Sequence, residues 1–125
     1  MSLVLVDSSV WIDYFKGSGS DELNDLIDKN QICTNEIILS ELLPILLHKK
    51  QTELVSLLKH ISVIDLKINW EEIINYQITN LKKGINQVGI PDLIIVQNLI
   101  QNSLVLFSKD KHFKLMSKEF KFRLF

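Results

Sequence analysis

The chain has 125 residues, of which 46% are hydrophobic and 23% are charged. This length and composition predict one globular domain, residues 1–125, and exclude an intrinsically disordered chain. The formal net charge of −1 excludes the capture of nucleic acid by bulk positive charge. No hydrophobic run approaches the roughly 20 residues of a membrane helix. The first residues lack the basic segment of a signal peptide, so we expect a cytoplasmic protein with no membrane partner.

Short hydrophobic strands alternate with amphipathic helices along the whole chain. The elements predicted in chain order are a strand at 3–6, a helix at 10–16, a break at 17–20, a helix capped by Ser20, a strand at 31–34, a helix after Asn35, a helix at 54–60, a strand at 62–66, a helix at 70–82, a loop at 85–89, a helix at 92–102, a strand at 104–107, a short helix at 113–116 and an edge strand at 120–125. This alternation predicts an α/β fold with a mainly parallel central sheet and helices on both faces.

Single residues add local expectations. Asn35 and Asn69 stand directly before helical segments, where an Asn side chain can accept hydrogen bonds from free backbone N–H groups. Pro44 lies inside a predicted helix and should bend or shorten it, because proline has no N–H to donate. Cys33 is the only cysteine, so the chain has no internal disulfide, and we expect a buried, inert thiol.

Four acidic residues interrupt or follow hydrophobic segments, where acids are rarely found without a partner. Asp7 and Asp110 come just after predicted strands. Asp92 opens a helix, and Glu41 lies on or beside the inward stripe of its helix. Because ligands of parallel α/β folds bind at the carboxyl ends of the strands, this topology can bring the four acids to one edge. A shared divalent cation is the simplest way to hold them together.

Each acid taken alone also has an ordinary structural interpretation. Asp7 can cap the first helix, which Ser8 or Ser9 can also do, and Asp110 can be a turn residue. Asp92 beside Pro91 can be an acid of a first helical turn. The occurrence of all four acids in this order favours a metal site over these separate structural roles.

Four segments of the sequence resemble the motifs of the PIN domain family, of the kind found in VapC-type toxins of bacterial toxin–antitoxin pairs. These segments are residues 4–15, 34–43, 89–95 and 106–113, in the order and at the spacing of the family. The resemblance implies a three-layer α/β/α sandwich and an endoribonuclease that hydrolyses RNA with Mg²⁺ or Mn²⁺. It carries catalytic and metal-binding roles onto Asp7, Glu41, Asp92 and Asp110, with Ser8 and Ser108 as polar support.

The resemblance also implies three partners, namely an RNA substrate, a small cognate antitoxin that blocks the site, and a second copy of the chain in a homodimer. Residues 109–125 carry six Lys or Arg against two acids, which is an excess of positive charge near the fourth motif. Such an excess is commonly an ordinary solvated surface, and the alternative hypothesis is a basic rim that contacts RNA phosphates. Its members are Lys82, Lys83, Lys109 and Lys111.

Two other functions compete with the nuclease interpretation. A non-catalytic PIN-like module would bind RNA or protein without cutting, and the loss of one or more acids would indicate it. A Mg²⁺-dependent phosphatase of the haloacid-dehalogenase type also places an Asp after its first strand. That enzyme needs a second Asp two positions later, where this chain has Ser9.

Overall fold

Five parallel strands form one sheet in the computed structural model, which describes residues 2–19 and 21–125. The order is β3-β2-β1-β4-β5. Strands β2 and β3 are added on one side of β1, and β4 and β5 are added on its other side. This arrangement confirms the predicted α/β fold and the edge strand near the C-terminus. The strands are β1 (Val4–Val6), β2 (Ile32–Thr34), β3 (Ser62–Val63), β4 (Val105–Phe107) and β5 (Arg123–Leu124).

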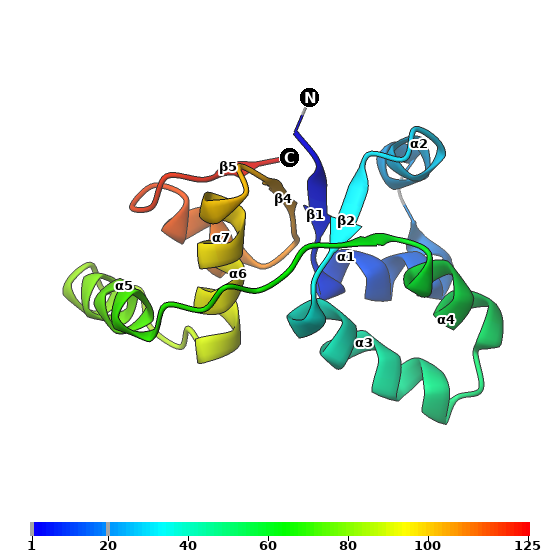
Figure 1. The fold of residues 1–125 in the computed structure, drawn as a ribbon, viewed down its shortest axis with the longest axis horizontal. Coiled ribbons are helices and arrows are strands. Elements are labelled where there is room, and N and C mark those ends of the chain that lie inside the picture. Colours follow the sequence, from blue (N-terminus) through cyan, green and yellow to red (C-terminus); the bar gives the residue numbers. More distant parts are fainter. Residues whose placement is uncertain (1, 20) are drawn as a thin grey trace.

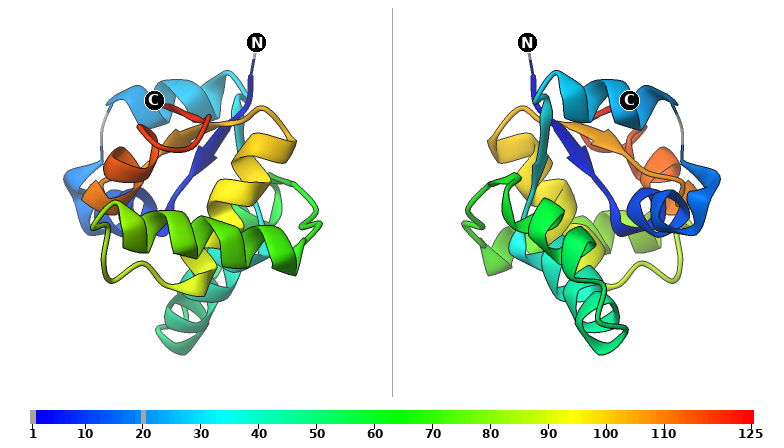
Figure 2. Two further views of the ribbon diagram at one scale, coloured as in Figure 1. Left: turned by 90° about the vertical axis from the view of Figure 1, so that its left-hand side faces the viewer. Right: turned by 90° about the vertical axis from the view of Figure 1, so that its right-hand side faces the viewer.

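Helices cover both faces of the sheet, as the alternating pattern predicts. Helices α1, α2 and α4 lie on one side, and α5, α6 and α7 lie on the other (Figure 1). Helix α3 extends away from the carboxyl end of β2 (Figures 1 and 2). None of the helices within 2–19 and 21–125 has the length and hydrophobicity of a membrane span. The helices are α1 (Ser8–Asp13), α2 (Asp21–Asp28), α3 (Glu36–His48), α4 (Thr52–Lys59), α5 (Trp70–Lys82), α6 (Ile90–Gln101) and α7 (Lys111–Met116), with a π-helical turn, η1 (Tyr14–Ser18), after α1.

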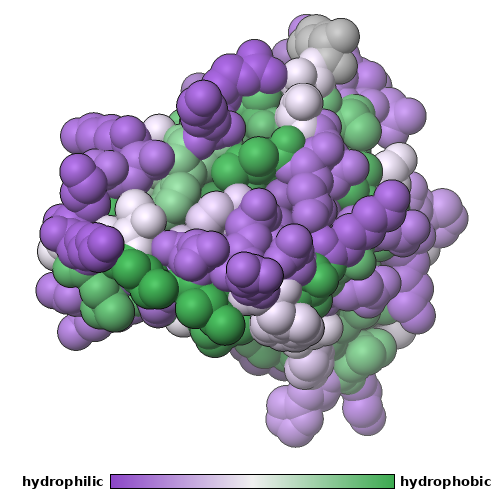
Figure 3. Space-filling model, turned by 60° about the vertical axis from the view of Figure 1, so that its left-hand side comes forward, coloured by the Kyte–Doolittle hydropathy of each residue, from purple (hydrophilic) through white to green (hydrophobic). Residues whose placement is uncertain are grey.

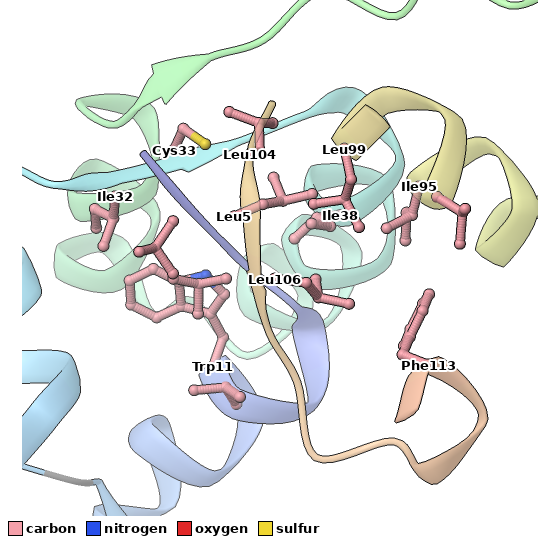
Figure 4. Packing of buried hydrophobic residues seen from close by; sticks show 14 of the residues in the cluster. Leu5, Trp11, Ile32, Cys33, Ile38, Ile95, Leu99, Leu104, Leu106 and Phe113 are labelled. Atoms are coloured by element: carbon pink, nitrogen blue, oxygen red, sulfur yellow. The ribbon is translucent and has the colours of Figure 1, made fainter. Parts of the chain in front are cut away.

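The hydrophobic core lies on both faces of the central strands. Leu5 of β1 and Leu106 of β4 are fully buried in the middle of the sheet. Trp11 of α1 packs on one face, whereas Leu99 of α6 and Phe113 of α7 pack on the other (Figure 4). Because β1 is covered on both faces, its sequence is hydrophobic at every position, as is usual for parallel strands.

Two local predictions were wrong. The predicted strand at 62–66 ends at Val63, because the Asp65 carbonyl accepts a hydrogen bond of 3.1 Å from Asn98 of α6 and the chain leaves the sheet. Of the two effects predicted for Pro44, a bend or a shortening of the helix, the shortening is wrong, because α3 continues to His48. Pro44 leaves the Ser40 carbonyl without its helical partner, and both residues are exposed, so water can hydrate this carbonyl.

Several helix ends differ from the predictions by a few residues. Helix α1 begins at Ser8, so Asp7 occupies the capping position, and of the three residues predicted for it the two serines do not. Helix α6 begins at Ile90, before Pro91. Asn35 and Asn69 do cap their helices, with side-chain oxygens 3.0 and 3.1 Å from backbone nitrogens. The predicted cap at Ser20 lies outside the described residues.

A buried amide pair joins α3, α6 and the segment after β3. Asn35 and Asn98 are almost fully buried, and the Asn35 amide nitrogen donates to the Asn98 side-chain oxygen over 3.0 Å. The Asn98 amide nitrogen donates in turn to the Asp65 carbonyl. Buried amides are stable only when they are hydrogen-bonded, so this pair fixes how the three segments meet.

Cys33 provides a simple test of the core. Its side chain is fully buried in β2, and burial raises the pKa of its thiol to about 12. Because the thiolate is the reactive form, we expect no reaction with Ellman's reagent in the native protein at pH 8. One thiol per chain should react after unfolding in guanidinium chloride. Rapid reaction of the native protein would contradict this placement.

Candidate active site

The candidate site begins where two acidic motifs lie side by side. One motif follows β1 and the other follows β4. These strands are neighbours at the point where the strand order reverses, which is where open α/β sheets usually bind ligands. Val6 pairs with Phe107, and the Asp7 backbone nitrogen donates to the Phe107 carbonyl over 2.9 Å. Asp7 is only 5% exposed. The parallel register therefore puts Asp7 beside Ser108, a residue 101 positions later.

Two serine hydroxyls hold the Asp7 carboxylate. Ser9 and Ser108 donate to its Oδ2 atom over 2.9 and 2.8 Å. The two hydroxyls are themselves fixed, since they accept the backbone N–H groups of Lys109 and Asp110 over 3.1 and 3.0 Å. Both serine bonds end on Oδ2, so Oδ1 is engaged by neither hydroxyl. Asp7 occupies the N-cap position of α1, but its side chain accepts no hydrogen bond from the backbone of that helix.

Asp92 enters the same region from the first turn of α6. Burial raises the pKa of its carboxyl above the ordinary value, and the negative charges of Asp110 and Asp7 raise it further. A hydrogen bond from the Gly89 backbone and the charge of His112 act in the opposite direction. Asp92 is therefore a first-turn acid of α6 and also lies within electrostatic reach of the two other aspartates.

Glu41 approaches from α3. Of the two places expected for Glu41, on or beside the inward stripe, the structure shows the second, because the residue is exposed next to the buried Leu42. The charges of Asp7 and Asp92 act on its carboxyl, so Glu41 lies on the side of α3 toward these acids. Partial burial raises the pKa of its carboxyl, the charges of Asp7 and Asp92 add to this rise, and a hydrogen bond with Ser8 lowers it. Glu41 interrupts the hydrophobic pattern because it faces these carboxylates.

Asp110 is the N-terminal cap of α7 and is half-buried. Its Oδ1 atom accepts from the backbone nitrogen of His112 and lies 2.9 Å from the Nδ1 atom of the same residue. The charge of Asp110 raises the pKa of Asp92, so the two carboxylates lie within electrostatic reach of each other. All four predicted acids thus belong to one electrostatically connected group, which we call the acidic cluster: Asp7, Glu41, Asp92 and Asp110.

The acidic cluster suits a hard divalent cation by its chemistry. In their present conformations, no three His, Cys, Asp or Glu side chains within 2–19 and 21–125 form a ready-made metal site. The donors are nevertheless all carboxylate oxygens, which Mg²⁺ and Mn²⁺ prefer. Two members of the cluster, Glu41 and Asp92, have pKa values raised in part by the negative charges around them. A cation at this place would offset that repulsion, so the residues present fit a metal.

Two neighbours of the acidic cluster were missed by the sequence interpretation. These neighbours are Ser9, which contacts Asp7, and His112, which contacts Asp110. Of the two predicted supports, Ser8 contacts Glu41 and Ser108 contacts Asp7. A serine two residues after a strand-terminal Asp is a local signal that could have indicated the first of these contacts. Nothing in the sequence indicates the second, because His112 looks like an ordinary loop residue.

The predicted basic rim is divided between two places. Lys109 forms an ion pair with Asp13 of α1, and Lys111 is the first residue of α7, next to Asp110. Lys82 and Lys83 lie instead at the C-terminal end of α5. The Lys83 ammonium is 3.8 Å from Glu119. The segment after β4 therefore carries the lysines that are closest in the chain to the acidic cluster.

A family model described as PIN domain matches residues 4–119 of the sequence, which is nearly the whole chain. The chain belongs to the PIN domain family. Among curated proteins, none matches this PIN domain in sequence at a significant level. The family assignment agrees with the three-layer fold and with the resemblance of the four motifs.

Several solved structures share the fold of this chain. VapBC2 from Rickettsia felis, bound to a promoter DNA fragment, matches with a TM-score of 0.75 and 17% identity over 98% of this chain and 97% of that chain. DNA-bound VapBC from Salmonella typhimurium matches with a TM-score of 0.78 and 16% identity, over 100% of this chain and 98% of that chain. FitAcB from Neisseria gonorrhoeae matches with a TM-score of 0.69 and 16% identity, over 98% of this chain and 96% of that chain. At these identities, the likeness concerns the fold.

Replacement of Glu41 by Gln tests the repulsion within the acidic cluster. A carboxyl whose pKa is raised by folding destabilises the folded protein at neutral pH, where it is charged. The metal-free Glu41→Gln variant should therefore melt a few degrees higher than the parent at pH 7. The gain should vanish as the pH falls below the ordinary Glu value of 4.5, where both states are protonated.

Differential scanning fluorimetry in EDTA across this pH range measures the effect. Asp65→Asn is the matched control, because Asp65 is exposed in the segment after β3 and only its backbone carbonyl binds Asn98. Equal melting temperatures for Glu41→Gln and the parent at pH 7 would contradict the predicted repulsion.

Proposed function

We propose that this PIN domain is a metal-dependent endoribonuclease and the toxin of a type II toxin–antitoxin pair. One observation carries the proposal: four carboxylates from separate segments of a PIN-family chain interact at the carboxyl edge of its sheet. The likeness of its fold to VapBC and FitAcB supports the toxin–antitoxin assignment. Phosphodiester hydrolysis suits such a site, because the reaction needs an activated water and stabilisation of negative charge.

Asp7 and Asp92 are the proposed direct metal ligands. A bound Mg²⁺ or Mn²⁺ would supply the Lewis acid that stabilises charge on the phosphate and lowers the pKa of water. The serine clamp keeps the Asp7 carboxylate in one rotamer with Oδ1 available. Glu41 is proposed to bind the metal or to orient the attacking water from the exposed face of α3. Asp110, held by His112, completes the acidic cluster.

The proposed partners are an RNA substrate, a small antitoxin and a second copy of the chain. A groove of about 340 Å³ between α1, α3 and α4 supports the antitoxin proposal. Hydrophobic side chains form most of its lining, with two lysines beside them, which suits an amphipathic helix that carries acidic residues. The lining includes Ile12, Phe15, Lys16, Ile45, Lys49 and Leu54.

Two alternatives make different use of the same residues. A non-catalytic RNA- or protein-binding module has no need for four intact acids, and this chain keeps all of them. A phosphatase of the haloacid-dehalogenase type needs a second acid where this chain has Ser9, whose hydroxyl is committed to the Asp7 carboxylate. Metal-dependent cleavage of RNA separates the nuclease from both alternatives.

Asp7→Asn is the decisive variant for the nuclease. It keeps the size of the side chain and can still accept the serine bonds, but it removes the charge that a cation requires. We expect Mg²⁺- or Mn²⁺-dependent cleavage of total cellular RNA to fall to background. Millimolar Mg²⁺ should also raise the melting temperature of the parent protein more than that of the variant.

Asp65→Asn serves as the control, since it removes an exposed acid outside the acidic cluster and should retain both effects. Gel analysis of RNA with and without EDTA measures cleavage. Undiminished metal-dependent cleavage by Asp7→Asn would refute the assignment of this residue.

Lys111→Glu tests the RNA-contact proposal. If this lysine contacts one phosphate, the log–log salt slope of RNA binding should fall by about 0.7 in magnitude, and affinity should weaken at low salt. Fluorescence anisotropy with single-stranded RNA, on an Asp7→Asn background to prevent cleavage, measures both quantities. Lys59→Glu on α4 is the control, because Lys59 is exposed and lies on the opposite side of the sheet from α7. Equal slopes for Lys111→Glu and the parent would exclude the contact.

A further inference from the structure

Helix α6 carries two polar residues inside a wholly buried segment. All residues of 93–99 are buried, and apart from two they are aliphatic side chains that can pack against any hydrophobic neighbour. The two exceptions are Gln97 and Asn98, each 1% exposed. A buried amide destabilises the fold unless it is hydrogen-bonded, so two adjacent amides at this depth are expected where the position of a helix has to be defined.

The two amides attach α6 to different elements. The Gln97 amide nitrogen donates to the Asn69 carbonyl over 3.1 Å and to the Glu72 carboxylate over 2.7 Å, which attaches α6 to the beginning of α5. Asn98 instead accepts from the side chain of Asn35, the residue that caps α3. Helices α3 and α6 both carry members of the acidic cluster, whereas α5 carries none of the four. The bond of Asn98 is therefore the one that joins two acid-bearing helices.

The contact between the two asparagines lies six residues from an acid on each helix. Glu41 follows Asn35 by six residues on α3, which is a rise of about 9 Å. Asp92 precedes Asn98 by six residues on α6, with the same rise of about 9 Å. The helices run in roughly opposite directions, because α3 leads away from the sheet and α6 leads back toward it (Figures 1 and 2). Both acids therefore lie on the same side of the contact, and the charge of Asp92 reaches the carboxyl of Glu41.

Hydrophobic packing alone defines the register of two helices only loosely, because the hydrophobic effect has no directional preference. Burial of hydrophobic side chains is also incomplete in this fold, since the side that α5 covers shows them among hydrophilic ones at the surface (Figure 3). A hydrogen bond has a restricted length and angle, so few positions of α6 along α3 can satisfy it. The bond of 3.0 Å between Asn35 and Asn98 thus supplies a register that aliphatic contacts do not.

We propose that the Asn35–Asn98 hydrogen bond is a positioning contact for cation binding, which sets the separation of Glu41 and Asp92 and through it the affinity of the acidic cluster for a divalent cation. The two asparagines act through the helices, not as ligands. Acids that are already held near their binding arrangement need less ordering when a cation binds, so affinity rises. The inference rests on the metal-dependent nuclease proposed above and adds two residues to its site.

The double variant Asn35→Ser/Asn98→Leu removes the bond without leaving a buried side-chain polar atom unpaired. Serine caps a helix about as well as asparagine, but its side chain is too short to reach α6, and it leaves room for the larger leucine. The Asp65 carbonyl loses its donor, and because Asp65 is exposed, water can replace this bond. Each single variant leaves one amide group buried without a partner, so the double variant should melt higher than either.

Titration calorimetry with Mn²⁺, without RNA and well below each melting temperature, measures the cation affinity of the folded proteins. The double variant and Asn35→Ser alone should each bind Mn²⁺ on the order of tenfold more weakly than the parent. Gln97→Leu is the matched control, since Gln97 is equally buried on the same helix but attaches it to α5. This control should lower the melting temperature and keep the parent affinity. Circular dichroism confirms that each variant is folded.

The possible outcomes separate this inference from the proposed function. If the parent binds Mn²⁺ and the folded double variant binds it equally tightly, the positioning role is overturned and the metal site stands. Equal weakening by Gln97→Leu would also overturn the positioning role, because the effect would then be a general loosening of α6. A parent chain that binds no Mn²⁺ would refute the metal-dependent nuclease itself, and this inference with it.

Discussion

The parallel pairing of β1 with β4 determines where the candidate active site forms. The two strands come from opposite ends of the sequence, yet their register sets the Asp7 backbone against Phe107 and its carboxylate against the hydroxyl of Ser108. Helices α1 and α7 then start from the ends of these strands. Glu41 of α3 and Asp92 of α6 then come within electrostatic reach of Asp7 at this junction.

The junction concentrates negative charge at a cost in stability. Asp7 is nearly buried, and the pKa values of Asp92 and Glu41 are raised by their surroundings. A fold selected only for stability would place hydrophobic or neutral residues at these positions, since burial disfavours charge. Charged groups that destabilise the folded protein are expected at functional sites, because a ligand that binds these charges stabilises the folded state. At Asp7, two hydroxyl bonds to the carboxylate replace hydrogen bonds to water that burial removes.

The sequence allowed the α/β class, most strand positions and the grouping of four acids to be predicted, from patterns that are visible locally in the chain. Hydrophobic periodicity and caps such as Asn35 are visible within a few residues. The contact of His112 with Asp110 was missed because it depends on how the loop after β4 turns into α7. The early end of β3 was missed for a similar reason, since Asn98 lies more than 30 residues away in the sequence. The continuation of α3 past Pro44 depends on solvent exposure, which the sequence does not show.

The buried amide pair has a consequence for the acids on either side of it. Asn35 caps α3, the helix that carries Glu41, and Asn98 lies on α6, the helix that begins beside Asp92. Repulsion between these two carboxylates acts to drive the helices apart. The bond between Asn35 and Asn98 links the two helices directly and therefore opposes their separation.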